Sequence, residues 1–437
     1  MSPASGNLVN RTGRQVADSA SMRDAGTVSD SQIVKVPLPT RNLGPQDVGR
    51  AFPLYVVWEI TMKCDQPCQH CGSRSGKVRE AELSTAEALE VAAALVRMGS
   101  REVTLIGGEA YLRDDCATLI ETLAKGGIRV TMQTGGRAFT KERAQRFRDA
   151  GLAALGVSID GMAKAHDQLR GNLGSSAAAW KALLNARDVG LIISANTQIN
   201  KINLPDLEEL ALRFRREGVQ TWQTQLTGPL GKAADYPERI IDPWQIVEIM
   251  DRLAAIQLEA MREFEAGGRK GIPFNVFANN NIGYFGPHEK VLRSVPYGKE
   301  THWRGCVAGI YSLGIESNGT LKACPTLPTG PYAAANIRDM KLEDVWERAE
   351  LMRFARDRGT DELWGFCKTC DYGEVCQAGC TWTAHSTLGR RGNNPFCYHR
   401  VIQLRKKGIR ERLIPVEKAP GIPFDFGRFE ISEEAIP

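Results

Sequence analysis

Ten of the eleven cysteines of this 437-residue chain lie in two sets with short, regular spacing. The front set is Cys64, Cys68 and Cys71, spaced C-x3-C-x2-C. Thiolates this close in sequence converge on one metal ion or cluster, because neighbouring turns can present them to a shared centre. The chain is therefore expected to fold around metal centres. The rear set is Cys306, Cys324, Cys367, Cys370, Cys376, Cys380 and Cys397.

Disulfides and zinc are the alternative uses of these cysteines. The odd cysteine count, the large chain and an N-terminus without an apolar signal argue against a disulfide framework. Zinc is the stronger alternative, since C-x2-C pairs commonly bind it and the four cysteines between residues 367 and 380 could form a zinc knuckle. The front set favours an iron–sulfur cluster, because three cysteines beside a glycine-rich strand end suit a cluster with one open iron.

Apolar, β-rich runs alternate with helix-like stretches over the first half of the chain. Ser84 and Glu87 form a capping box that starts an expected helix ending at Gly99. This alternation predicts a parallel sheet with helical crossovers. The front cysteines follow the first strand and Gly107-Gly108-Glu109 follows the second, so both motifs fall at strand C-termini, where such folds bind ligands. The expected strands are 55–60, 103–106, 128–132, 153–159, 191–197 and 219–226.

The cysteine spacing together with Gly107-Gly108-Glu109 resembles the radical S-adenosylmethionine (SAM) enzymes that carry a C-terminal SPASM domain. The resemblance covers about residues 52–400. It implies an α/β fold, a partial (β/α)6 radical SAM barrel followed by a small cysteine-rich SPASM domain with auxiliary Fe–S clusters. The expected divisions are a disordered N-terminal leader over 1–48, the barrel over 49–235, a helical and strand bridge over 236–299, the SPASM auxiliary-cluster domain over 300–400, and a C-terminal helix and tail over 401–437.

The resemblance also implies the chemistry of the front set. In this family three cysteines hold a [4Fe–4S] cluster whose open iron binds the amino and carboxylate groups of SAM. The reduced cluster cleaves SAM to methionine and a 5′-deoxyadenosyl radical, which removes a hydrogen atom from the substrate. The residues matched to the cluster are Cys64, Cys68 and Cys71.

Several further residues match SAM-binding positions of the family. Gly107, Gly108 and Glu109 would offer backbone groups to the methionine amino group, although a Gly-Gly pair can also be a simple turn. Ser158 and Asp160 end the fourth strand and would contact ribose or methionine. Arg170 would pair with the methionine carboxylate, or be a surface arginine. His70 stands where the family usually has an aromatic residue near adenine. Gln133, Thr134 and Gly135 are expected to line the same cavity.

By the same resemblance the rear cysteines bind two auxiliary clusters, expected to be [4Fe–4S]. The cluster assigned to Cys306, Cys324 and Cys380 has only three thiolates, because the segment before Cys306 lacks the cysteine that some family members have. Its fourth iron could stay open, or accept Glu300 or His302, and His302 could equally hydrogen-bond its own loop. The ligand sets are Cys367, Cys370, Cys376 and Cys397 for one cluster, and Cys306, Cys324 and Cys380 for the other.

Auxiliary clusters suit reactions in which the product loses an electron after hydrogen abstraction. We therefore expect oxidative crosslinking or dehydrogenation of a ribosomally synthesised peptide, since SPASM enzymes mostly act on peptides. The alternative is a small-molecule dehydrogenase or a natural-product tailoring enzyme. A non-catalytic iron–sulfur carrier is disfavoured, because it would need no SAM pocket. Cys116 could return a hydrogen atom in an epimerisation, or simply be a small buried apolar residue.

The expected partners are a precursor peptide and an electron donor of the flavodoxin or ferredoxin type. Recognition of the peptide would need either a separate peptide-recognition protein or binding of the peptide leader to the barrel itself. A net charge of +5 is too mild to indicate nucleic acid. No stretch approaches the ~20 apolar residues that cross a bilayer, so a cytoplasmic location is expected. The sequence leaves the substrate, the bond formed and the catalytic residues open. Residues 279–284, rich in asparagine, could face the cavity or form a surface loop.

Overall fold

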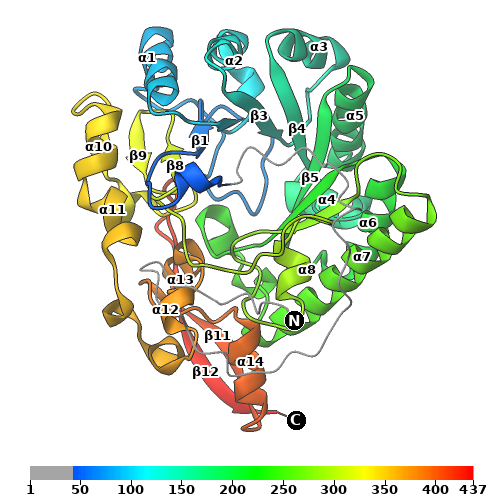
Figure 1. Ribbon diagram of the computed structural model, residues 1–437, viewed down its shortest axis with the longest axis vertical. Helices are drawn as coiled ribbons and strands as arrows, with labels where there is room; N and C mark the ends of the chain where they lie inside the picture. The colour runs from blue at the N-terminus through cyan, green and yellow to red at the C-terminus, as the bar shows by residue number, and fades with distance from the viewer. Residues whose placement is uncertain (1–42, 437) are drawn as a thin grey trace, which may run out of the picture.

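A ten-stranded sheet organises the computed structural model, which describes residues 43–436 (Figure 1). The strand order is β10-β9-β8-β1-β2-β3-β4-β5-β6-β7, and the two ends of the sheet do not pair with each other. The expected leader over 1–48 falls mostly outside the described residues. The strands of the sheet are β1 (Tyr55–Glu59), β2 (Glu102–Ile106), β3 (Arg129–Thr134), β4 (Leu152–Ser158), β5 (Ile192–Ile199), β6 (Thr221–Leu226), β7 (Asn275–Ala278), β8 (Ser312–Ile315), β9 (Thr320–Lys322) and β10 (Ala335–Asn336).

The expected parallel α/β sheet is confirmed, and the structure extends it at both ends. All neighbours from β1 to β7 pair in parallel. Strand β7 comes from the segment predicted to be a bridge and adds a seventh parallel strand. Strand β8 pairs in parallel with β1, matching Tyr55 with Ser312, and β9 and β10 follow as antiparallel strands. The cysteine-rich second half of the chain thus continues the sheet.

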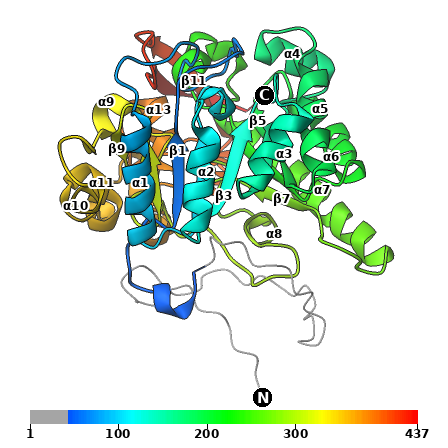
Figure 2. The same cartoon turned by 90° about the horizontal axis from the view of Figure 1, so that it is seen from above.

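Helices cover the outer face of this sheet, as Figure 2 shows for α1, α2 and α3. Ser84 caps α1 and exchanges hydrogen bonds with Glu87, so the predicted capping box is confirmed. The helices are α1 (Thr85–Arg97), α2 (Cys116–Lys125), α3 (Lys141–Asp149), α4 (Ala163–Arg170), α5 (Ser175–Asp188), α6 (Leu207–Arg216), α7 (Ile246–Ala266), α8 (Glu289–Arg293), α9 (Thr329–Tyr332), α10 (Leu342–Arg348), α11 (Glu350–Asp357), α12 (Gly373–Cys376), α13 (Thr381–Leu388) and α14 (Tyr398–Arg405).

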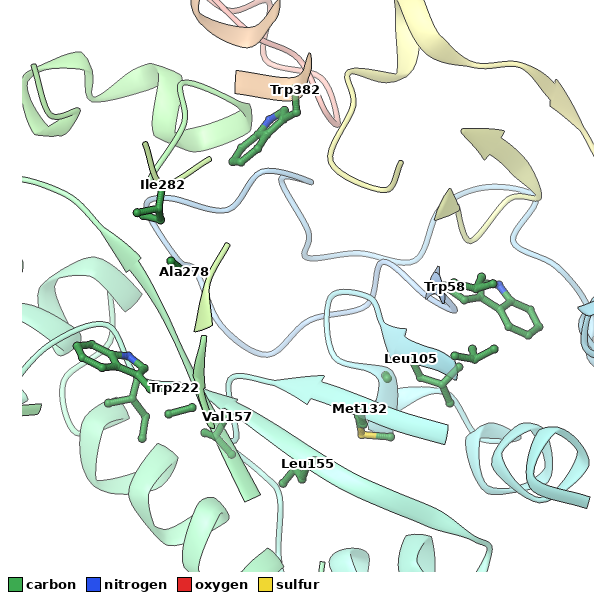
Figure 3. Packing of buried hydrophobic residues seen from close by; sticks show 14 of the residues in the cluster. Trp58, Leu105, Met132, Leu155, Val157, Trp222, Ala278, Ile282 and Trp382 are labelled. Atoms are coloured by element: carbon green, nitrogen blue, oxygen red, sulfur yellow. The ribbon is translucent and has the colours of Figure 1, made fainter. Parts of the chain in front are cut away.

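Alternate residues of each central strand point outward into the core beneath these helices. Leu105, Met132, Leu155 and Trp222 belong to this outward set and are fully buried (Figure 3). Since successive strand residues point to opposite faces, the remaining residues of each strand form the inner, concave face. The apolar outer face fixes the register of the sheet, and the inner face is left for binding.

The chain ends in a two-stranded antiparallel hairpin of β11 (Ile409–Glu417) and β12 (Arg428–Ala435). The hairpin lies near α13 and α14 in Figure 1. Buried Arg400 of α14 donates to both carboxylate oxygens of Glu411, at 2.8 and 2.7 Å. The paired strands give the tail more order than its proline and glycine content predicts. Among the described residues, no helix is both long and apolar enough to span a bilayer.

Candidate functional site

The front cysteines lie on the loop that leaves β1, and each sulfur faces an N–H donor. The amide of Gln66 lies 3.4 Å from Cys64 Sγ, the amide of Ser75 lies 3.4 Å from Cys71 Sγ, and Arg170 Nη1 lies 3.5 Å from Cys68 Sγ. Such donors stabilise sulfur that carries negative charge, as in the ligands of iron–sulfur clusters. The donor set therefore fits a cluster held by three thiolates.

Burial works against thiolates at this loop unless a cation is bound. Burial, together with the smaller effects of negative charge on Glu109 and on the other two cysteines, raises the pKa of Cys64 to about 12. Burial also raises the pKa of Cys68, against the opposing effect of the Arg170 charge. Metal cations remove this penalty, because they deprotonate coordinating thiols outright. Bare thiols here would stay neutral.

Gly107 and Gly108 let the end of β2 pack directly on the cysteine loop. A methyl group on Gly107 would overlap the Thr61 carbonyl, and one on Gly108 would overlap the Lys63 carbonyl. The amides of Gly108 and Glu109 donate to those same two carbonyls at 2.8 Å. Because these N–H groups are engaged, the segment can offer carbonyl oxygens, which suit an ammonium group rather than a carboxylate.

Glu109 is buried and turns away from solvent into the end of β3. Its carboxylate accepts hydrogen bonds from the Thr134 hydroxyl and, at 2.7 Å, from the Gly135 amide. Burial raises the pKa of Glu109 to about 7. Among residues 43–436, Cys64, Asp65 and Glu109 present ligand atoms within 4.8 Å of one another. The predicted motif thus contacts the cysteine loop through its backbone, and the Glu109 carboxylate lies near Cys64 and Asp65.

Asp160 is the centre of a buried polar network behind the front cysteines. One carboxylate oxygen accepts from Arg170 and from His70 Nε2 at 3.0 Å, and the other accepts from the Gln198 amide at 2.8 Å. The Arg170 and His70 charges hold the pKa of Asp160 far below its usual range, although burial alone would raise it. Arg170 is therefore buried, and its interpretation as a surface arginine is wrong.

Both ring nitrogens of His70 are engaged, Nε2 by Asp160 and Nδ1 by the Leu169 carbonyl at 3.2 Å. The ring borders a small cavity between the cysteine loop and the ends of β5 and β6. Ser158 ends β4 on the inner face of the sheet, beside Asn196 of β5. The cavity is lined by Gln69, His70, Leu169, Asn200, Thr227, Ala233, Tyr236, Arg239 and Ile240.

The rear cysteines form two separate groups. The Cys380 thiol interacts electrostatically with Cys306 and Cys324, and its pKa is raised to about 12, mainly by burial. Cys376 interacts instead with Cys367, Cys370 and Cys397, and burial raises its pKa well above the ordinary value. These are the two ligand sets that the resemblance implies, but metal binding by them stays a prediction. The four-cysteine group of Cys367, Cys370, Cys376 and Cys397 surrounds a cavity. The stacked rings of Phe285 and Tyr372, whose centroids are 4.1 Å apart, form one edge of this cavity.

Glu300 and His302, the candidate fourth ligands of the Cys306, Cys324 and Cys380 group, differ in exposure. Glu300 is 70% exposed at its side chain and pairs with Lys290 at 2.8 Å. His302 is half-buried, and its Nε2 atom has no hydrogen-bond partner among the described residues. The Thr326 hydroxyl, which the sequence did not single out, lies 3.3 Å from Cys324 Sγ. Cys116 is buried on α2 within the hydrophobic core, apart from all three groups.

The inner face of the sheet is rich in amides and hydroxyls, which the sequence analysis missed. Strands β4, β5, β6 and β7 contain no charged residue. Asn196 donates to Gln133, while its own Oδ1 atom is buried with no partner in the described chain. Asn279 of the following loop donates to Gln225 at 3.2 Å, so part of the 279–284 segment does face this surface. The polar inner-face residues of strands β4 to β7, with Gln133 of β3, are Gln133, Ser158, Ser194, Asn196, Gln198, Thr221, Gln223, Gln225 and Asn275.

Two family profiles match the chain. The profile of the radical SAM superfamily matches residues 58–214, and that of an iron–sulfur cluster-binding domain, SPASM, matches residues 306–371. The radical SAM profile includes all three front cysteines. The SPASM profile ends before Cys376, Cys380 and Cys397.

Similar proteins include heme-related synthases and maturases. Two proteins of Methanosarcina barkeri are an AdoMet-dependent heme synthase, 28% identical over 80% of this chain and 97% of its own, and an Fe-coproporphyrin III synthase, 33% identical over 78% and 87%. Mycofactocin maturase MftC of Mycolicibacterium smegmatis is 28% identical over 80% and 83%. The structure of Streptococcus suis SuiB bound to S-adenosylmethionine has a TM-score of 0.58 at 17% identity, covering 80% of this chain and 76% of SuiB. Another SuiB structure, with a TM-score of 0.57, contains the precursor peptide SuiA.

Proposed function

Since the chain belongs to the radical SAM enzymes that carry a SPASM domain, we propose that it oxidatively modifies a ribosomally synthesised peptide, by crosslinking or dehydrogenation. When bound, the front cluster and SAM supply the one-electron cleavage that yields a 5′-deoxyadenosyl radical. The chain itself holds the reactants, excludes competing reactions and provides the surface that selects the substrate.

Cys64, Cys68 and Cys71 would hold the front cluster. The three N–H donors aimed at their sulfurs support this role. Carbonyl groups of Gly107–Glu109 would bind the methionine ammonium group, and Arg170 with its partner Asp160 would bind or orient the methionine carboxylate. The cavity beside His70 would receive the adenosyl part, and Ser158, at the end of β4, would contact the ribose or methionine.

The rear groups would hold two auxiliary clusters. Cys367, Cys370, Cys376 and Cys397 supply four thiolates for one, and Cys306, Cys324 and Cys380 supply three for the other. Burial, and after it repulsion within each group, raises the pKa of Cys376 and Cys380, so bound cations would be needed to hold these cysteines as thiolates. We retain the division into barrel (49–235), bridge (236–299) and SPASM domain (300–400) as part of this proposal.

The uncharged inner face of strands β4 to β7 is the observation that favours a peptide over a tetrapyrrole. Heme and coproporphyrin carry propionate carboxylates, which proteins bind with arginine or lysine. Strands β4 to β7 offer amides and hydroxyls instead, and these match the donors and acceptors of peptide backbone. The similarity to MftC and to peptide-bound SuiB points the same way.

A tetrapyrrole enzyme is the second candidate, because the heme synthase and Fe-coproporphyrin III synthase match most of the chain. The two candidates differ in what they would bind. Loaded, reduced enzyme with SAM would be incubated with peptides encoded beside its gene, and separately with Fe-coproporphyrin III, and the products followed by mass spectrometry. We expect a peptide to lose two hydrogens. Decarboxylated porphyrin without any peptide product would overturn the proposal.

The cluster assignment has its own test. Replacing Cys64, Cys68 and Cys71 with alanine should abolish 5′-deoxyadenosine formation while the rear groups keep their iron, about 8 of about 12 atoms at tetranuclear stoichiometry. Zinc instead of iron in anaerobically purified protein would contradict the rear assignment. We further propose a flavodoxin- or ferredoxin-type electron donor, a separate recognition protein and a cytoplasmic location.

A further inference from the structure

Three consecutive residues in the segment between β11 and β12 contact three separate parts of the molecule. Phe424 and Asp425 are buried, and Phe426 is half-buried, although the preceding residues 420–423 are exposed. Phe424 also has φ +55°, a left-handed conformation that costs energy for a side chain of this size. Such a conformation persists only where the surrounding contacts enforce it. We call residues 424–426 the strap.

Asp425 connects the strap to the front cysteine loop. Its Oδ1 atom accepts from Arg74 Nε at 2.7 Å, and its backbone carbonyl accepts from the Gly231 amide at 2.8 Å. Arg74 is three residues after Cys71, and its amide donates to the Cys71 carbonyl at 3.3 Å. The same carbonyl accepts from the Lys232 amide at 2.9 Å. Cys71 is thus held through both Arg74 and the 231–232 segment, and Asp425 bonds to both.

Phe424 connects the strap to the SPASM half. Its ring lies 3.8 Å from Lys322 Nζ and 5.8 Å from the Arg79 guanidinium. Lys322 is fully buried, pairs with Glu316 at 2.7 Å and is two residues from Cys324. Arg79, from the segment after the front cysteines, pairs with the other oxygen of Glu316 at 2.7 Å. The ring therefore covers a buried ion cluster that joins the two halves.

Phe426 connects the strap to the mouth of the sheet. It forms an antiparallel bridge with Leu230, just beyond β6, and its ring packs edge-on against His385 of α13 at 5.0 Å. A methyl group on Gly231 would overlap the carbonyls of Cys71 and Gly72, so the backbone pressed by the strap lies directly on the cysteine loop. The 230–232 segment transmits the position of the strap to Cys71.

We propose that Asp425 is a positioning residue, which fixes Cys71 and the front cluster loop through Arg74 and Gly231 while Phe424 anchors the strap on the SPASM half. The proposal rests on the proposed function only in assigning a cluster to the front cysteines. The strap sets the place of the front loop relative to the Cys306, Cys324 and Cys380 group, and so the width of the space between them.

The test compares Asp425→Ala and Asp425→Asn with Glu430→Ala, an exposed control on the same hairpin that pairs with Arg428 at 3.0 Å. Amide hydrogen exchange of full-length apoprotein should quicken about 10-fold or more over residues 71–76 and 230–232 in both Asp425 variants, because a charge-assisted hydrogen bond is lost. Exchange in α2 and α5 should not change. A uniform rise over the whole chain, or rates equal to wild type at the loop, would overturn the proposal.

A second readout uses the loaded protein. A ferrous chelator should remove iron from the front cluster about 10-fold faster in Asp425→Ala than in Glu430→Ala, and the SAM-responsive EPR signal follows this loss. Iron loss from the rear groups should be equal in the two variants. Asp425→Glu, which keeps the carboxylate as a partner for Arg74, should restore slow loss. Failure of the wild-type protein to bind a front cluster would refute the proposed function, whereas the exchange experiment would still decide the role of Asp425. If Asp425→Ala does not fold, Asp425→Asn decides both readouts.

Discussion

Arg170 Nη1 lies 3.5 Å from the Sγ atom of Cys68, while the other terminal nitrogen of the same guanidinium pairs with Asp160. The Arg170 side chain is buried, and its Nε atom has no partner among the described residues. A cation held this close to a cluster ligand stabilises the additional negative charge of the reduced cluster. The residue matched by family resemblance to SAM thus also contacts Cys68, one of the proposed cluster ligands.

Replacing Arg170 should lower the reduction potential of the front cluster. Arg170→Met removes both the N–H donor and the positive charge at Cys68, whereas Arg170→Lys keeps the charge and should retain part of the effect. Redox titration followed by EPR, without SAM, measures the potential. We also expect 5′-deoxyadenosine formation to fall at least about 10-fold. An unchanged reduction potential combined with weaker SAM binding would show that Arg170 acts only by binding the methionine carboxylate, and not on the cluster.

Gly108→Ala should disrupt the front loop, because a methyl group there meets the Lys63 carbonyl and the Cys64 Cβ atom. Backbone cannot move aside as a flexible side chain can, so we expect a stability loss of about 1–3 kcal/mol and a large fall in front-cluster iron. Gly76→Ala is the matched control, since Gly76 bridges to Lys63 and has open space around its Cα atom. Iron content and thermal unfolding of both variants give the comparison. Similar behaviour of the two would contradict the steric argument.

The strands of the barrel could be predicted because their information is local. Alternating apolar runs gave β1 to β6 within two residues, and Ser84 with Glu87 gave the start of α1. The position of β8 beside β1 could not be predicted this way, since Tyr55 and Ser312 pair across most of the chain. Short strands such as β8 carry little periodicity of their own, and their partners are chosen by packing.

In the candidate site, too, the features with local sequence signals could be predicted, and those that depend on residues far apart in the sequence could not. Grouping of the cysteines followed from spacing and family resemblance, because ligands of one centre lie close in sequence. Asp425 and Arg74 are 351 residues apart, and neither occurs in a recognisable motif. The amide-rich inner face could have been recognised from the period-two polar residues of β5 and β6, Asn196 and Gln198 with Gln223 and Gln225. Their meaning depends on knowing which face the helices cover.

Glu59 should make the apoprotein less stable as the pH rises toward neutrality. Burial raises its pKa from 4.5 to about 7, so the folded state holds a proton that the unfolded state releases. Stability therefore falls between about pH 4.5 and pH 7 and is level above that range. Glu59→Gln lacks this titration, and its stability relative to wild type should rise by about 3 kcal/mol over the interval. Urea unfolding at several pH values tests this, and a pH-independent difference would contradict it.

Tyr284→Phe should destabilise the rear half of the molecule. The buried Tyr284 hydroxyl accepts from the Cys380 amide at 2.8 Å and donates to the Asn280 carbonyl at 2.6 Å. Its loss leaves the buried Cys380 amide without its acceptor, which costs about 1–3 kcal/mol. Tyr297→Phe is the control, because the Tyr297 hydroxyl has longer contacts, 3.3 Å to the Met261 carbonyl and 3.2 Å to Glu265, and should cost under about 0.5 kcal/mol.

The same pair of variants separates local from general effects at the rear cysteines. Because Tyr284 bonds to the amide of Cys380 and also lines the cavity of the four-cysteine group, its hydroxyl lies between the two rear groups. The phenylalanine ring keeps that cavity wall, and the shorter of the two hydrogen bonds that the hydroxyl accepts is the one from the Cys380 amide, at 2.8 Å against 3.4 Å from Asn394 Nδ2. We therefore expect Tyr284→Phe to change the EPR spectrum of the Cys306, Cys324 and Cys380 cluster more than that of its neighbour. Equal changes at both clusters, or none, would show that the hydroxyl does not act through Cys380.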